Sequence, residues 1–192
     1  MRSEAAFGIE WTVHERKPRA EIEALHETLQ ASIAIDGPDE FAVLVYAAQL
    51  LETGYAVARL TGYADREPAL DHSDIVELFL CLDSVLEALT ERRIGLIELY
   101  PGPDPSEFIV FDAGPEEVLL YRVPWSETAV LDLERPLPTR VTERPVAACG
   151  PDELADQLRS LRGSFARAAL EHDPRLAAHE PIRAWARPEA GQ

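Results

Sequence analysis

The densest local grouping of potential metal ligands in the sequence surrounds His72, whose neighbours are Asp71, Ser73 and Asp74. An imidazole and carboxylates can bind a metal ion, but protein metal sites need three or four ligands at set spacings, as in the HExxH pattern. The sequence lacks such a pattern. Because residues of these types also cap the start of a helix, we interpret the grouping as a helix cap and predict no metal site.

Other catalytic motifs are also missing. The remaining histidines are scattered without the neighbours of a catalytic triad, and no serine lies in a GxSxG context. The stretch 100–105 has one glycine among three prolines, unlike a phosphate-binding loop or a dinucleotide fingerprint. We therefore predict no catalytic residues and no cofactor. An enzyme of unknown chemistry with dispersed residues is kept as a third hypothesis.

One helix has a distinctive outer face. Apolar residues recur at helical spacing over 73–92 and predict a stripe that faces the core. At 100° per residue, Leu80 falls on the opposite side within an acidic surface. If nothing covers it, this face is a binding patch for a basic protein, whereas a second packed layer would bury Leu80. The predicted partner-binding residues are Val76, Glu77, Leu80, Asp83, Glu87 and Glu91.

The charge of the chain is concentrated in one block. The 192 residues contain 35 acidic and 18 basic side chains, a formal net charge of −17. Residues 21–134 hold 24 acidic and 5 basic groups, so this block has a net charge of −19. Such a field disfavours nucleic-acid binding, which depends on neutralising phosphates. It favours a basic partner, although solubility alone is an alternative explanation.

The sequence also predicts the compartment. It contains no apolar stretch of 18 residues and no signal peptide at its start, so we expect a cytoplasmic protein that does not contact a membrane. Cys81 and Cys149 are the only cysteines and are predicted to be free thiols. The preference for Arg over Lys, with many Ala and Pro, is typical of GC-rich bacterial genomes.

The elements that would position these residues follow from periodicity. Helical spacing predicts helices over 18–36, 38–53, 73–92 and 150–172, of which 38–53 is apolar on all sides and could instead be a buried strand. Alternating and apolar runs predict strands at 7–16, 55–61, 94–100, 107–112 and 117–123, with an irregular extended segment over 129–149. A loop is predicted over 62–71.

Together these patterns predict a single α+β domain over 1–187, with an antiparallel sheet of about four to six strands covered by three to four helices. Residues 188–192 are expected to be a disordered tail, whereas Ile182 and Trp185 are expected to dock. For function we expect a noncatalytic acidic binding protein, most concretely an immunity-type inhibitor that masks a basic toxin site. A secretion chaperone or adaptor for a secreted effector is the alternative, and the oligomeric state is left open.

Overall fold

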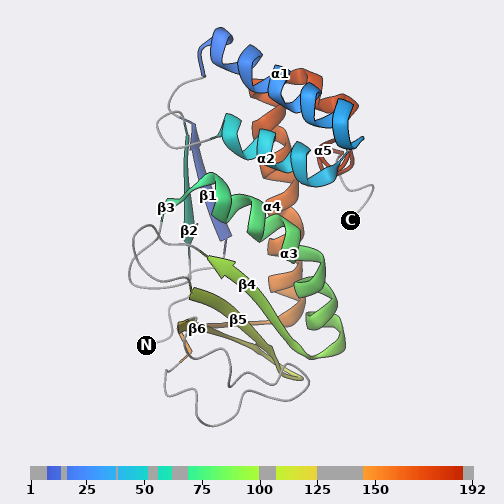
Figure 1. The fold of residues 1–192 in the computed structure, drawn as a ribbon. Coiled ribbons are helices and arrows are strands. Elements are labelled where there is room, and N and C mark those ends of the chain that lie inside the picture. Colours follow the sequence, from blue (N-terminus) through green and yellow to red (C-terminus); the bar gives the residue numbers. More distant parts are fainter. Residues whose placement is uncertain are drawn as a thin grey trace.

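Two antiparallel sheets and four long helices make up the fold, which confirms the predicted α+β class (Figure 1). The structure is a computed structural model that describes residues 8–13, 17–37, 39–51, 56–61, 69–99, 107–124 and 145–187. The proposed tail 188–192 and most of the extended segment 129–149 lie outside these residues. The boundaries of a single domain at 1–187 therefore stay a prediction.

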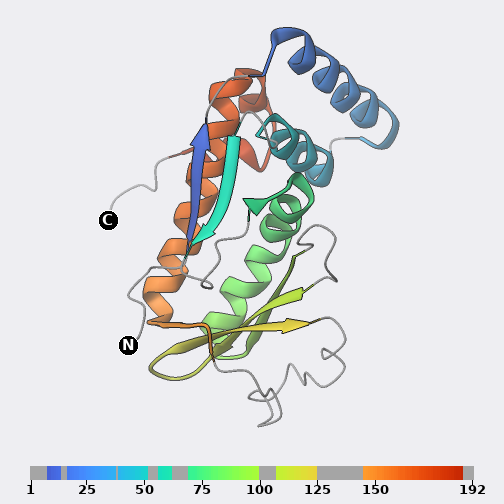
Figure 2. The ribbon, with the colours of Figure 1, turned by 90° about the vertical axis from the view of Figure 1, so that its left-hand side faces the viewer.

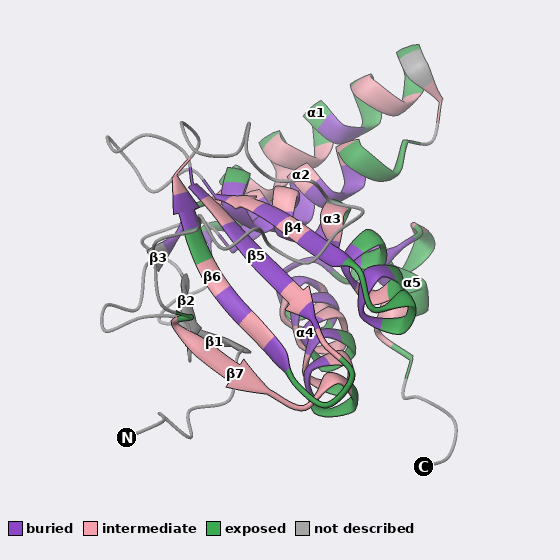
Figure 3. Cartoon of the chain, turned by 90° about the horizontal axis from the view of Figure 1, so that it is seen from below, coloured by how far each residue is buried: buried purple, intermediate pink, exposed green. Residues whose placement is uncertain are grey.

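The larger sheet has four strands in the order β4-β5-β6-β7. They are β4 (Ile94–Leu99), β5 (Glu107–Ala113), β6 (Val118–Pro124) and β7 (Ala147–Cys149). The first three form the predicted meander, in which Ile97 pairs with Ile109 and both are fully buried. Figure 3 shows buried residues along β4 and β5 and half-buried ones along the edge strand β7.

The remaining strands form a second sheet that the sequence did not separate from the first. It has the order β1-β2-β3, with β1 (Gly8–Val13), β2 (Ala56–Thr61) and the short β3 (Ala69–Leu70). Strand β3 falls inside the predicted loop 62–71, so that prediction was wrong for its last residues. Two residues provide too little alternation to be recognised as a strand.

Helix α3 (His72–Glu91) is the centre of the core. The predicted cap is confirmed, because the Asp71 carboxylate accepts the N–H of Asp74 at 3.0 Å and Asp74 accepts the N–H of Asp71 at 3.2 Å. One side of α3 lies on the larger sheet, where a Cβ at Gly95 would come within 3.3 Å of the Val85 Cα. This glycine therefore permits β4 to approach the helix closely.

Helices α1 (Arg19–Asp36) and α2 (Glu40–Leu50) form a hairpin. Within the described part of the ambiguous segment 38–53, Glu40–Leu50 is thus a helix, and the apolar residues on all its sides are explained by packing against α1, α3 and α4. Gly37 ends α1 with a φ of 84°, a backbone conformation that residues other than glycine rarely adopt. Figure 2 shows α1 extending outward from the rest of the fold, with α2 as its principal neighbour.

The C-terminal part consists of α4 (Pro151–His172), a 3₁₀ turn (Pro174–Ala178) and the short α5 (Ile182–Trp185). The expected docking of this end is confirmed, because Ile182 is fully buried. The Trp185 ring packs 5.5 Å from the Phe79 ring and 6.5 Å from the Phe165 ring, measured between centroids. These contacts attach α5 to both α3 and α4.

A buried polar cluster joins the helical hairpin to the end of α4. The Tyr46 hydroxyl donates to the Asp173 carboxylate, which also accepts two bonds from Arg175 Nε at 2.8 and 3.0 Å. Arg175 in turn donates to Glu23 on α1 at 2.8 Å. Burial and the bond to Asp173 raise the pKa of Tyr46, so the phenol stays a donor. His26 Nδ1 lies 3.7 Å from the same carboxylate.

We expect Arg92→Gly to stabilise the fold. Arg92 follows the last residue of α3 with a φ of 56° and a ψ of 48°, a left-handed conformation that glycine adopts without strain. The free energy of unfolding should rise by about 1 kcal/mol, measured by urea denaturation. An equal or lower stability would show that the exposed Arg92 side chain compensates for its backbone strain.

We expect Asp173→Asn to lower the free energy of unfolding by about 2–3 kcal/mol at neutral pH, because it removes the buried partner of Arg175. Glu23→Gln is the matched control. It removes the outer carboxylate that contacts the same arginine. Because the Glu23 side chain is 45% exposed, it should contribute less than about 1 kcal/mol to the free energy of unfolding. Equal losses for the two variants would contradict the importance of the buried cluster.

The same carboxylate should make stability depend on pH. Burial alone would raise the pKa of Asp173, but the hydrogen bonds from Arg175 and Tyr46 outweigh it and hold this pKa below 3.8. The stabilisation is therefore complete above the ordinary Asp range and is lost as the pH falls through 3.8 toward the folded-state pKa. Thermal scans between about pH 6 and about pH 2 span this range. On acidification the melting temperature of Asp173→Asn should fall less than that of the wild type.

Candidate functional site

The outer face of α3 is exposed at its centre, as the binding-patch hypothesis requires. Leu80 is 42% exposed, so no second layer buries it. Val76 is buried at 6% exposure and cannot belong to a surface patch. Glu77 is half-buried, and its carboxylate accepts the Cys81 thiol at 3.2 Å. The exposed part of the predicted patch is therefore smaller than the helical projection indicated.

The carboxylates around Leu80 are partly neutralised. Asp83 forms an ion pair with Arg162 of α4, and Glu91 forms one with Arg93 at 2.5 Å. Glu87 is exposed and forms no ion pair within the described part of the chain. Sequence spacing places these acidic groups correctly on one face but cannot reveal which cations reach them. Two of the four carboxylates of the α3 face are thus paired with arginines, whereas Glu77 and Glu87 form no ion pair within the described residues.

A stronger candidate lies on the helical hairpin. A groove of about 340 Å³ separates α1 from α2. Its apolar lining comes from Leu25 and Leu29 on α1 and from Phe41, Ala42 and Val45 on α2. Its lining also includes the polar residues Thr28, Ser32, Asp39, Tyr46 and Gln49. Apolar walls with a few polar groups are typical of surfaces that bind a helix or a short segment of another protein.

The hairpin also has the most exposed apolar side chains of the described residues. Ile35 is 81% exposed and Phe41 is 51% exposed. Within the apolar stripe of α1, Leu29 is buried, whereas Ile22, Leu25 and Ile33 remain half-buried. A helix that packed fully within its own domain would bury this stripe. The partial burial leaves apolar surface for a partner.

The hairpin is acidic after Arg19, the first residue of α1, which pairs with Glu23 at 3.8 Å. Residues 20–51 contain six acidic side chains and neither Lys nor Arg. One cation from another element reaches them among the described ion pairs, through the contact between Arg175 and Glu23. This absence of basic residues was readable in the sequence, but the half-buried stripe was not, because periodicity does not show how far an apolar face is covered.

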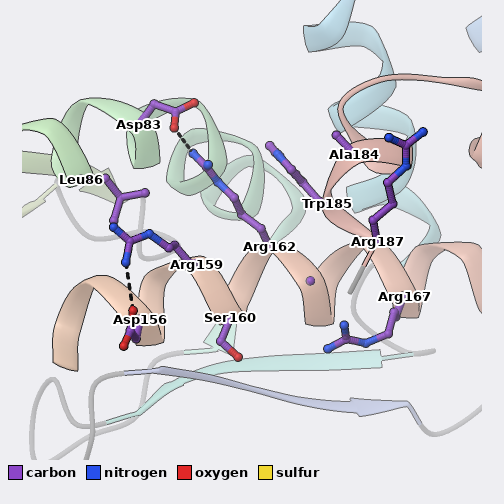
Figure 4. Close-up of a pocket in the computed structure, with 11 residues that line it drawn as sticks. Asp83, Leu86, Asp156, Arg159, Ser160, Arg162, Arg167, Ala184, Trp185 and Arg187 are labelled. Atoms are coloured by element: carbon purple, nitrogen blue, oxygen red, sulfur yellow. Dashed lines mark hydrogen bonds and ion pairs between the residues drawn. The ribbon is translucent and has the colours of Figure 1, made fainter. Parts of the chain in front are cut away.

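A second cavity, of about 660 Å³, lies between α3, α4 and α5 (Figure 4). Its lining includes four arginines, two carboxylates and Trp185. The arginines are Arg159, Arg162, Arg167 and Arg187, and the carboxylates are Asp83 and Asp156. The surface of α4 between them carries Ser160 and Gly163, whose small size leaves the space open.

The acidic charge of residues 21–134 predicts that Arg159, Arg162 and Arg167, on the polar side of α4, pair with that block. Arg162 does so through Asp83, which is 79 positions away in sequence. Arg159 instead pairs with Asp156 on its own helix, at 2.9 Å. Arg167 forms no ion pair within the part of the chain that the structure describes. The expectation is thus confirmed for one of the three residues.

The two cysteines are free thiols, as predicted, and are poor nucleophiles. Burial raises the pKa of Cys81 to about 12, and the bond to Glu77 adds to this effect. Burial also raises the pKa of Cys149 to about 11, with a further contribution from Glu153. Because the thiolate is the reactive form, neither residue is activated for covalent catalysis.

The described residues contain neither a cluster of metal ligands nor a membrane-spanning helix. No three potential metal ligands gather there. Over the same ranges no helix has both the length and the apolar character to cross a bilayer. Comparisons with protein families, curated proteins and solved structures found no match to the chain.

We expect Gly163→Ala to stabilise the fold while reshaping the arginine-lined cavity. Alanine in a helix interior is favoured over glycine by about 1 kcal/mol. The added Cβ would lie 3.0 Å from Nη1 of Arg167, the mobile end of an exposed side chain that can move aside. A higher melting temperature in calorimetry would agree with this reasoning. A lower one would show that Arg167 is held rigidly over Gly163.

Proposed function

We propose that the protein is a noncatalytic acidic binding protein whose helical hairpin captures a basic, amphipathic segment of a partner protein. The observation that carries this proposal is the combination of an apolar groove, exposed Ile35 and Phe41, and a hairpin without Lys or Arg after Arg19, the first residue of α1. Apolar side chains of the partner would fill the groove. Its basic side chains would face the acidic groups of α1 and α2.

The overall charge supports fast and selective association. A net charge of −17 attracts a basic partner over a distance and repels acidic proteins. The groove then supplies the short-range contacts, because apolar burial contributes most of the binding free energy at such surfaces. Charge alone would explain solubility, whereas charge around an uncovered apolar groove favours binding.

The concrete form of this function is an immunity-type inhibitor that covers the basic active site of a toxin. Carboxylates on the hairpin would occupy positions that substrate phosphates take in that site. A chaperone or adaptor for a secreted effector is the second candidate. The groove between α1 and α2 favours it, since such a groove suits a single amphipathic segment.

The shared claim is testable with a defined probe. A fluorescein-labelled amphipathic peptide of Leu and Lys, about 18 residues or five helical turns long, should bind with a saturable rise in anisotropy. A peptide in which Glu replaces each Lys should not bind. Phe41→Asp, which places a charge in the groove wall, should weaken binding of the Lys peptide by at least about tenfold.

Leu80→Asp is the matched control, because it adds the same charge at a large, partly exposed apolar side chain that lies on α3, outside the hairpin. It should leave both the melting temperature and peptide binding nearly unchanged. If Leu80→Asp weakens binding and Phe41→Asp does not, the face of α3 is the binding surface and the hairpin assignment is wrong. Equal binding of the Glu peptide would refute recognition of a basic partner.

A further inference from the structure

The arginine-lined cavity has a local charge opposite to that of the chain. Its four arginines outnumber its two carboxylates, in a protein with a formal charge of −17. A basic cavity would repel a basic partner, so it does not contribute to the proposed capture of such a partner. A concentration of guanidinium groups in such a protein therefore points to a separate ligand, and that ligand must be an anion.

Two of the arginines are fixed and two are unpaired. The ion pairs of Arg162 with Asp83 and of Arg159 with Asp156 hold these side chains at the cavity wall (Figure 4). Arg162 also stacks over Trp185, with its guanidinium carbon 5.2 Å from the ring centroid. Arg167 and Arg187 form no ion pair within the described ranges, so their charges are available to a ligand.

The dimensions indicate a small molecule. A volume of about 660 Å³ lies in the range of roughly 300–1,000 Å³ that is usual for small-ligand sites, and it far exceeds one phosphate ion. The acidic surface of the whole chain would repel a long polyanion such as a nucleic acid. A small ligand that enters the cavity experiences mainly the local field of the arginines.

The chemistry of arginine favours phosphate. A planar guanidinium offers parallel N–H donors that match two oxygens of a phosphoryl group. The Ser160 side chain at the cavity surface can add a hydroxyl donor. We propose that the cavity between α3, α4 and α5 binds a phosphorylated small molecule, with Arg167 and Arg187, whose guanidinium groups lie apart in Figure 4, contacting different anionic groups of the ligand.

Isothermal titration calorimetry on the full chain tests this proposal at constant ionic strength. Pyrophosphate and a nucleoside diphosphate should bind saturably and raise the melting temperature, each more tightly than orthophosphate. Arg167→Gln with Arg187→Gln should weaken binding by at least about tenfold. Arg183→Gln should leave affinity within about twofold, because Arg183 lies on α5 outside the cavity lining and pairs with Glu180.

Gly163→Ala separates binding from folding. It should bind pyrophosphate several-fold more weakly while melting no lower than wild type, because its Cβ displaces the Arg167 guanidinium. The proposal is overturned if heats of binding do not saturate, if Arg183→Gln loses as much affinity as the double variant, or if orthophosphate binds as tightly as the larger probes. Tighter binding of citrate would also overturn it.

Discussion

The burial of α3 is the constraint on which the rest of the structure depends. Its apolar stripe contacts the larger sheet on one side and helices α2 and α4 on the others, so each of these elements is positioned by the same helix. The contact is close enough that a side chain at Gly95 would have to displace Val85 by a few tenths of an ångström. With three sides occupied, α3 can present only a narrow surface around Leu80 to solvent. Both larger candidate sites consequently lie on helices that pack around α3 or beyond it.

Electrostatic repulsion within residues 21–134 is moderated by cations from the C-terminal part of the chain. Arg162 of α4 reaches Asp83, and Arg175 reaches both Asp173 and Glu23. The exposed pairs contribute little free energy individually, but the buried Asp173 combines charge pairing with the Tyr46 hydrogen bond. The C-terminal segment therefore balances charge at the positions where it docks. The hairpin beyond Glu23 receives no such compensation from the described ion pairs.

Sequence periodicity predicted the elements well where a long apolar stripe meets a clear cap, as at Asp71 and the helix that follows it. The hydrogen-bonded meander of β4 to β6 was equally predictable from short, turn-rich connections. Periodicity could not separate the two sheets, because strand pairing depends on contacts distant in sequence. It also placed Val76 on the surface, since a helical projection does not include the neighbours that cover a flank. The arginine cavity needed three helices in space before it could be recognised.

The two candidate sites differ in the physical reason for their charge. On the hairpin, six acidic residues follow Arg19 without a further Lys or Arg, and they accompany apolar surface that the fold itself leaves uncovered. In the cavity, basic side chains are concentrated against the charge of the chain, and half of them are fixed by ion pairs while Trp185 stiffens one wall. A general need for solubility would spread charge over the surface and would not concentrate acidic groups at one site and arginines at the other. Local separation of charge, combined with open apolar or cavity space, is therefore the feature that distinguishes a binding role from acidity alone.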